Sequence, residues 1–249
     1  MKKIFYIALF STLICWQACV QAPSSTSEVS KVRFSMEHKV RQPEISTRKA
    51  PMLVLLHGLR SNENDLFAIA PSLDERLLVV SVRAPFDAGG GRYKWYDYQS
   101  NTSGKPIIDI KQAEESRTML IDFIEQLVEA YNVDAERVYL GGFSQGAMMS
   151  YSVGLTQPDK VKGIASFSGN IPDWIKEKLA DKSELSDLSV FISHGKKDPV
   201  LPFSDALSDK DFLEKMNINT NFHSYETAHT MNRQNILDFQ KWIKLMIND

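Results

Sequence analysis

A serine flanked by glycines is the first residue that could do chemistry. It stands at the centre of Gly142-Phe143-Ser144-Gln145-Gly146, after an apolar run and before a helical stretch that starts at Ala147. A serine on a sharp strand-to-helix turn has a strained backbone, and the residues two before and two after it must be small. The pattern predicts that Ser144 is a nucleophile and that the Gln145 N–H stabilises a developing oxyanion.

A serine hydroxyl needs a base, which a third group orients. In sheets that carry this turn, the base follows the last strand, in the chain order serine, acid, histidine. His223 lies inside a β-like run near the C-terminus and His229 lies in the loop beyond it. The freedom of a loop favours His229 as the base, with His223 as the alternative. We expect His57 and His194, each at the end of a predicted strand, to brace loops through hydrogen bonds.

The acid is expected between the serine and the base. Asp198 lies in a turn directly after a predicted strand, in Gly195-Lys196-Lys197-Asp198-Pro199. There it would hold the histidine tautomer and stabilise the imidazolium. An Asp-Pro pair also starts turns without any catalytic role, so Asp187 and Asp205 are the alternatives. The second oxyanion donor is predicted to be the Leu59 N–H, just after the first buried strand.

Short apolar runs alternate with amphipathic helical patterns along most of the chain. This alternation predicts an α/β protein with a mainly parallel central sheet of about seven strands and helices on both faces. Functional loops gather at the carboxyl ends of such strands. The expected strands are Val32–Met36 as an edge strand, Met52–Leu56, Leu77–Val82, Val138–Leu140, Gly163–Phe167, Val190–Ser193 and Asn221–Tyr225, and the clearest helices are Ile110–Tyr131 and Asn235–Ile247.

Composition places the chain among ordinary globular proteins. It has 249 residues, of which 43% are hydrophobic and 24% charged, with a formal net charge of −2. These values argue against a disordered, collagen-like or polytopic membrane chain. The absence of a basic excess gives no indication of a nucleic-acid partner. Both cysteines, Cys15 and Cys19, lie near the N-terminus, so a disulfide framework cannot hold the fold together.

The N-terminus has the layout of an export signal. Lys2 and Lys3 precede an apolar run that is too short to span a bilayer comfortably. Ala18-Cys19 resembles a bacterial lipoprotein box, which predicts a signal peptide over residues 1–18 and lipidation of Cys19. Cleavage after Ala22 and an uncleaved anchor are the alternatives. Residues 19–30 form a polar tether. We expect residues 31–249 to form one catalytic domain, exported to the periplasm or the outer membrane and attached to a membrane only through its anchor.

Several segments together resemble the phospholipase/carboxylesterase family, the acyl-protein-thioesterase-like branch of the α/β-hydrolases. They are Leu55–Leu59, Asn64–Phe67, Gly142–Ala147 and His194–Pro202. The resemblance implies the α/β-hydrolase fold and a serine hydrolase without cofactor or metal. Such an enzyme cleaves carboxylic ester or thioester bonds through an acyl-enzyme. The family's triad falls on Ser144, Asp198 and His229, and its oxyanion donors fall on Leu59 and Gln145. The acyl chain, the alcohol and the oligomeric state are not specified by these motifs.

The chain departs from the family pattern at a few positions. Arg60 stands where a second glycine is usual, which predicts a more constrained oxyanion loop or a charge directed toward the pocket. Ala228 precedes His229 where many members have glycine. Trp95 and Tyr96 lie in a segment resembling the family's aromatic loop and are predicted to bind substrate. The alternative for this loop is a surface hairpin packed by its own aromatic residues.

Three rival functions remain at this stage. One is peptidase or acyltransferase chemistry on the same scaffold, which no specific feature of the sequence supports. A secreted esterase that removes acetyl or feruloyl groups from polysaccharide would use the same triad with a different pocket. A binding protein without catalytic activity could also be built on a hydrolase scaffold, although such proteins usually lack a triad member and none is missing here.

Overall fold

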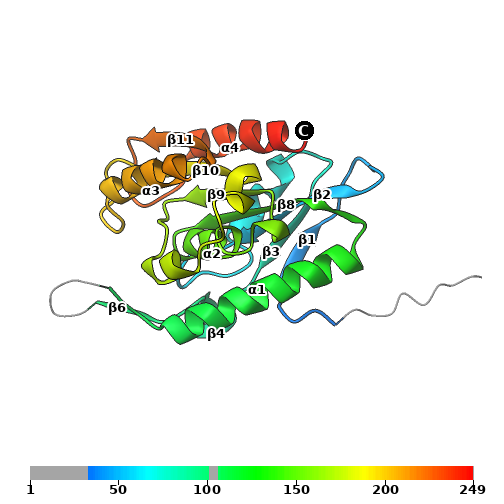
Figure 1. Ribbon diagram of the computed structural model, residues 1–249. Coiled ribbons are helices and arrows are strands. Elements are labelled where there is room, and N and C mark those ends of the chain that lie inside the picture. The colour runs from blue at the N-terminus through cyan, green and yellow to red at the C-terminus, as the bar shows by residue number, and fades with distance from the viewer. Residues whose placement is uncertain (1–32, 101–105, 249) are drawn as a thin grey trace, which may run out of the picture. The chain divides into compact units, whose positions relative to one another are not determined.

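A twisted sheet of seven strands forms the centre of the molecule (Figure 1). The computed structural model describes residues 33–100 and 106–248, so the predicted signal peptide, Cys19 and the whole tether lie outside the described residues. The strand order is β1-β3-β2-β8-β9-β10-β11. Their bounds are β1 His38–Arg41, β2 Ala50–Leu56, β3 Leu78–Val82, β8 Val133–Phe143, β9 Gly163–Phe167, β10 Ser189–Gly195 and β11 Asn219–Tyr225.

Every neighbouring pair in this sheet is parallel except β1, which runs antiparallel to β3. The predicted mainly parallel sheet of about seven strands is therefore confirmed. Two small hairpins lie outside it. They are formed by β4 Phe86–Gly89 with β5 Arg92–Lys94, and by β6 Tyr98–Ser100 with β7 Pro106–Ile108.

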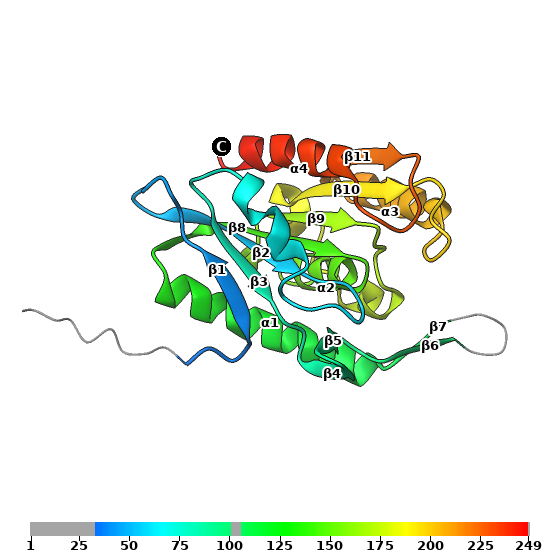
Figure 2. The same cartoon turned by 180° about the vertical axis from the view of Figure 1, so that it is seen from behind.

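Helices cover both faces of the sheet, as Figures 1 and 2 show from opposite sides. One face packs against α1 (Ile110–Ala130), α2 (Gln145–Gly154) and α3 (Phe203–Lys215), and the other packs against α4 (Arg233–Met246) and the short 3-10 helix η1 (Leu66–Ser72). Three further 3-10 helices, η2 (Pro158–Lys160), η3 (Asp173–Lys178) and η4 (Glu184–Asp187), lie in connections. Strand β2 is buried throughout. Val54 and Leu56 belong to one hydrophobic core and Leu53 and Leu55 to the other, because successive side chains of a strand point to opposite faces.

The edge strand lies later in the chain than predicted. The alternation in residues 32–36 predicts a strand there, but β1 begins at His38. Phe34 instead stacks on Tyr131 at the end of α1, with 5.9 Å between ring centroids, and the Ser35 N–H donates to the side chain of Gln126. The apolar side chains of this segment therefore pack on a helix rather than on a sheet.

Helix α3 was not among the predicted elements. Only Ala206 and Leu213 are buried along its 13 residues, so its apolar stripe is too narrow to stand out in the sequence. By contrast α1 and α4 carry wide apolar stripes, and both begin and end within two residues of the predicted bounds.

The parallel arrangement brings distant loops to one edge. Strands β2, β8, β10 and β11 all end at this carboxyl edge. The chain segments that leave them contain all the predicted triad and oxyanion residues.

Candidate active site

Ser144 sits on a tight turn between β8 and α2. Its backbone has φ 52° and ψ −117°, a strained conformation for a residue with a side chain. Its N–H donates to the Phe167 carbonyl at 2.9 Å, and its own carbonyl accepts from the Met148 N–H at 3.1 Å. A Cβ added to Gly142 would lie 2.3 Å from the carbonyl carbon of Gly146. The turn can therefore close only with glycine at the position two before the serine, as the sequence pattern requires.

The loop after β2 touches this turn closely. A Cβ on Gly146 would lie 2.0 Å from the Leu56 carbonyl oxygen and 2.6 Å from that of His57. A Cβ on Gly58 would lie 3.0 Å from the Phe143 ring and 3.4 Å from its carbonyl oxygen. Two glycines thus let two backbone segments approach on either side of the serine.

Ser144, His229 and Asp198 form a continuous hydrogen-bonded chain. The distance from Ser144 Oγ to His229 Nε2 is 2.9 Å, and that from His229 Nδ1 to Asp198 Oδ2 is 2.7 Å. An ionised carboxylate can only accept, so the Nδ1–H donates to Asp198 and the unprotonated Nε2 accepts from the serine hydroxyl. This tautomer is the one that a general base needs. The Phe143 ring packs against the imidazole, with 5.0 Å between the centroids.

Asp198 is held by several donors. Burial acts to raise its pKa, but hydrogen bonds from the Leu201 N–H, from His229 and from the Val200 N–H outweigh this, so the pKa lies below its ordinary value. The two backbone bonds to Oδ1 measure 2.9 and 2.8 Å. His194 is fully buried and donates its Nε2–H to the Leu201 carbonyl at 3.0 Å. The carboxylate therefore remains ionised and fixed in direction.

Backbone hydrogen bonds join the turn that contains Asp198 to the loop that contains His229. The Lys196 N–H donates to the Tyr225 carbonyl at 2.7 Å, and the Lys197 N–H donates to the Thr227 carbonyl at 3.0 Å. A Cβ on Gly195 would lie 2.4 Å from the Thr227 carbonyl oxygen. The turn after β10 and the loop after β11 are thereby locked together.

The alternative residues lie elsewhere. His223 packs between Phe191 and Tyr225, with 3.8 Å from its Nδ1 to the nearest oxygen of Asp238. Asp187 lies at the opposite edge of the sheet, and Asp205 lies in the first turn of α3. The hydrogen bonds to Ser144 and His229 are thus made by the residues that the sequence favours.

The backbone N–H groups of Leu59 and Gln145 make no hydrogen bond within the part of the chain that the structure describes. The loop that carries Leu59 is held from behind by strand β5. The Arg60 N–H donates to the Tyr93 carbonyl at 2.9 Å, and the Tyr93 N–H donates to the Ser61 carbonyl at 2.7 Å. Two unpaired donors, Leu59 on this fixed loop and Gln145 at the start of α2, therefore lie beside the serine turn.

The His57 side chain braces the same loop. Its Nδ1–H donates to the Gly58 carbonyl at 2.8 Å, and its Nε2 accepts from the Ala84 N–H at 3.0 Å. Burial lowers the pKa of His57, which keeps the imidazole neutral. The N–H and C=O of one peptide point in opposite directions, so fixing the Gly58 carbonyl also fixes the direction of the Leu59 N–H. The expected bracing role of His57 is confirmed.

The Gln145 side chain has a role that the sequence did not reveal. Its Oε1 accepts from the Trp95 N–H at 2.9 Å, and its Nε2 donates to the Tyr96 carbonyl at 2.9 Å. These partners are backbone groups about fifty positions away, so no local pattern marks them. Gln145 thus holds the end of the β4–β5 hairpin against the serine turn.

The sequence predicts that Trp95 and Tyr96 bind substrate, but the structure places both side chains in the core. Their exposed fractions are 0% and 1%. The Trp95 indole N–H donates to the His57 carbonyl at 2.8 Å, and the Tyr96 hydroxyl donates to Met148 Sδ at 2.9 Å. Both aromatic rings therefore support the loops around the serine from inside the core.

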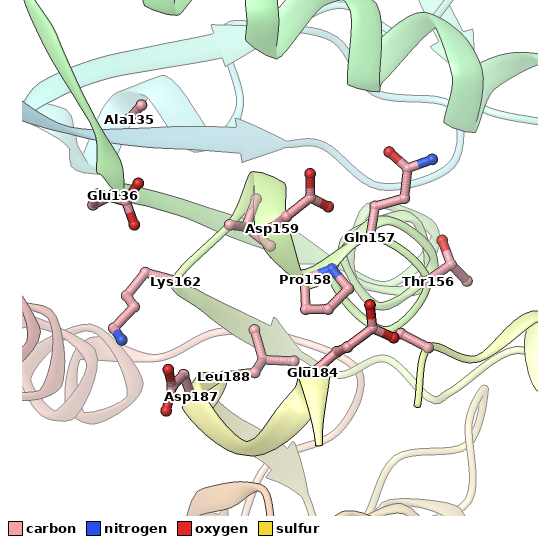
Figure 3. Close-up of a pocket in the computed structure, with 12 residues that line it drawn as sticks. Ala135, Glu136, Thr156, Gln157, Pro158, Asp159, Lys162, Glu184, Asp187 and Leu188 are labelled. Atoms are coloured by element: carbon pink, nitrogen blue, oxygen red, sulfur yellow. The ribbon is translucent and has the colours of Figure 1, made fainter. Parts of the chain in front are cut away.

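A separate cavity of about 410 Å³ lies at the opposite edge of the sheet (Figure 3). It is lined by residues just before β9 and β10, including Lys162 and Leu188, and by Thr156–Asp159. Its lining includes Asp187, the alternative acid, but no triad or oxyanion residue. Within the described ranges no group of three or more histidine, cysteine, aspartate or glutamate side chains is arranged to hold a metal ion, and no helix there is long and apolar enough to cross a membrane.

Comparisons with solved structures agree with this fold. A carboxylesterase from Bacillus cereus superposes with a TM-score of 0.74 at 24% identity, covering 85% of this chain and 95% of that one. Acyl-protein thioesterase 2 from Zea mays gives a TM-score of 0.71 at 19% identity, covering 85% and 99%. At these identities the likeness concerns the fold, which is that of the α/β-hydrolases.

Sequence comparisons extend to the family. Acyl-protein thioesterase 1 from Mycosarcoma maydis is 27% identical over 236 residues, covering 84% of this chain and 96% of that protein. Acyl-protein thioesterase 1 from Debaryomyces hansenii is 28% identical over 165 residues, covering 64% and 70%. A model of the phospholipase/carboxylesterase family matches residues 38–247, nearly the whole described chain. The protein is therefore a hydrolase with esterase or thioesterase activity, and it belongs to the phospholipase/carboxylesterase family.

Proposed function

We propose that the protein hydrolyses carboxylic esters through an acyl-enzyme on Ser144. The observation that carries this is the pair of hydrogen bonds, 2.9 and 2.7 Å long, from Ser144 to His229 and from His229 to Asp198. His229 Nε2 removes the hydroxyl proton as Ser144 Oγ attacks the carbonyl carbon. The imidazolium then protonates the leaving alcohol as the bond to it breaks. Water, deprotonated by the same imidazole, attacks the acyl-enzyme. The imidazolium returns that proton to Ser144 Oγ as the acyl bond to the serine breaks, which releases the acid and the free serine.

The tetrahedral oxyanion would be held by the N–H groups of Leu59 and Gln145. Both are unpaired among the described residues, and both belong to segments in contact at the serine turn. The positive end of helix α2 adds to this stabilisation. Loss of one such donor typically lowers kcat by about 10²–10³-fold. Rigid support of the Leu59 loop by His57 and Tyr93 thus favours a preformed oxyanion hole.

Esters and thioesters are both suitable substrates for this arrangement. The relatives named acyl-protein thioesterases make thioesters a candidate, and the carboxylesterase from Bacillus cereus makes simple esters one. The polysaccharide alternative would use Trp95, Tyr96 and Tyr98 to stack on a sugar ring. Trp95 and Tyr96 are buried, whereas Tyr98 is 44% exposed, so this alternative now depends on Tyr98 alone. The hydrogen-bonded chain is complete, which argues against a binding protein without activity.

A fluorophosphonate probe tests the assignment of the serine. The wild-type protein should be labelled and should hydrolyse 4-nitrophenyl acetate, whereas Ser144→Ala should do neither. Ser204, an exposed serine on α3, provides a matched control, and Ser204→Ala should be labelled like wild type. Undiminished labelling of Ser144→Ala would refute the proposal. His229→Ala should lose ester turnover, and wild-type turnover in this variant would move the base to His223.

We also propose export and lipidation at Cys19, on the sequence of residues 1–22. Metabolic labelling with an alkyne fatty acid should mark the wild-type protein in bacterial cells and should leave Cys19→Ser unmarked. A mature N-terminus after Ala22 would instead indicate plain secretion, and retention of Met1 would indicate an uncleaved anchor.

A further inference from the structure

A cavity of about 420 Å³ lies directly beside the oxyanion loop. It is lined by Leu59 and Arg60 from this loop and by residues of the β4–β5 hairpin and the segment after it, namely Ala88, Lys94, Asp97 and Tyr98. Leu59 is also the residue whose N–H we assign to the oxyanion hole. A substrate bound at Ser144 could therefore place a substituent in this cavity.

The cavity carries one uncompensated positive charge. Lys94 is paired with Asp97, with 2.7 Å between Nζ and Oδ1, and Asp97 also accepts from the Gln112 side chain at 3.0 Å. The side chain of Arg60 is exposed and makes no hydrogen bond or ion pair with any residue that the structure describes. The Asp97 carboxylate is thus already paired with Lys94 and Gln112, and the Arg60 guanidinium remains available to bind a ligand.

The backbone at Arg60 is held in a conformation that favours glycine. Its φ is 59°, and its N–H is fixed by the 2.9 Å bond to the Tyr93 carbonyl. Arginine tolerates this left-handed region poorly, whereas glycine adopts it freely. A strained non-glycine residue next to a reactive centre is a recurrent mark of a functional role. The strain, the cavity and the unpaired charge all point to one side chain.

We propose that Arg60 binds an anionic group on the substrate, a carboxylate or phosphate oxygen pair attached to the ester. A guanidinium presents two parallel N–H donors that match such a pair of oxygens. The enzyme then prefers esters that carry a negative charge close to the scissile bond. This inference rests on the proposed hydrolysis at Ser144 and names the substrate class for that site.

The test compares matched neutral and anionic esters. The acyl side is probed with 4-nitrophenyl acetate against mono-4-nitrophenyl succinate. The alcohol side is probed with methyl 4-acetoxybenzoate against 4-acetoxybenzoate, and with 4-acetoxyphenyl phosphate as the phosphate arm. The first variant is Arg60→Asn, because asparagine tolerates the left-handed backbone. The second is Arg60→Lys, which keeps the positive charge but lacks the two parallel N–H donors of the guanidinium. The control is Arg92→Gln, an exposed arginine on β5 outside the cavity lining.

The quantity measured is the ratio of kcat/KM for each anionic ester to that of its neutral partner. We expect Arg60→Asn to lower this ratio about tenfold or more on at least one side, mainly through KM, as loss of a charge-assisted hydrogen bond does. Arg60→Lys should keep part of the preference, and Arg92→Gln should match wild type. The proposed subsite would be wrong if wild type and Arg60→Asn had the same kcat/KM ratio for every ester pair. It would also be wrong if Arg92→Gln lowered this ratio as much as Arg60→Asn does. Failure of the proposed function is distinct, because the wild-type enzyme would then hydrolyse none of the esters.

Discussion

Gly141→Ala and Gly142→Ala add the same methyl group at adjacent positions, but we expect only Gly142→Ala to lower stability and activity strongly. A Cβ on Gly141 meets the Leu55 Cδ2 methyl at 3.2 Å, which is the flexible end of a side chain and can move by a few tenths of an ångström. A Cβ on Gly142 meets the backbone of Gly146 at 2.3 Å and the Ala147 nitrogen at 2.5 Å. Neither glycine has a left-handed φ, so alanine fits the backbone at both positions and steric contact alone differs.

The magnitude follows from how far the neighbours must move. At Gly142 the contact is about 1 Å too short, and the obstacle is the first turn of α2 itself. Overpacking of this kind costs about 1–3 kcal/mol. At roughly 2–4 °C per kcal/mol, a loss of 2–3 kcal/mol lowers Tm by about 4–12 °C. A shift of about 1 Å in the serine would also lower kcat about 10²-fold. For Gly141→Ala the reduced entropy of the unfolded chain offsets the mild contact, so stability stays within about 1 kcal/mol of wild type.

Thermal unfolding followed by circular dichroism and kcat for 4-nitrophenyl acetate would measure both effects. Gly141→Ala serves as the matched control, since the substitution and the strand are the same. Equal losses in the two variants would refute the steric argument and show that β8 tolerates no methyl group at this end. Wild-type activity in Gly142→Ala would show that the turn closes without a small residue there.

Further predictions concern three polar side chains. Gln145→Ala leaves two buried backbone groups unpaired, at about 1–3 kcal/mol each, so Tm and kcat should both fall; an unchanged Tm would mean that water replaces the amide. Asp198→Asn presents an amide N–H₂ to His229 Nδ1 and favours the wrong tautomer, so kcat for a nitrophenyl ester should fall about 10³–10⁴-fold with little change in KM. Burial raises the pKa of Asp209 to about 7, although its carboxylate accepts the Ile171 N–H at 2.8 Å. The folded state then keeps a proton that the unfolded state loses above pH 4, so this group's contribution to stability falls between pH 4 and 7. Asp209→Asn should raise Tm above wild type by more at pH 8 than at pH 5, where only part of this loss has occurred, and equal differences at both pH values would contradict this.

The sequence by itself determined the strand pattern and the residues at the strand ends. Continuous apolar runs such as Met52–Leu56 are typical of strands buried on both faces, and β2 has this burial. The small residues around Ser144 predict the turn because the steric contacts that require them, such as that between Gly142 and Gly146, are between residues close in the chain. Chain order then favoured Asp198 and His229, and the structure hydrogen-bonds these residues to each other and to the serine.

Only the tertiary structure decided which buried side chains support the oxyanion loop. Gln145, His57 and Trp95 bond to backbone groups far away in the chain, and such pairs leave no periodic trace in a sequence. For the same reason Trp95 and Tyr96 were predicted to bind substrate, because the sequence shows that these residues are aromatic but not which side chains of their loop face the solvent. The charge at Arg60 was visible in the sequence, but its lack of a partner depends on every side chain that packing brings near it.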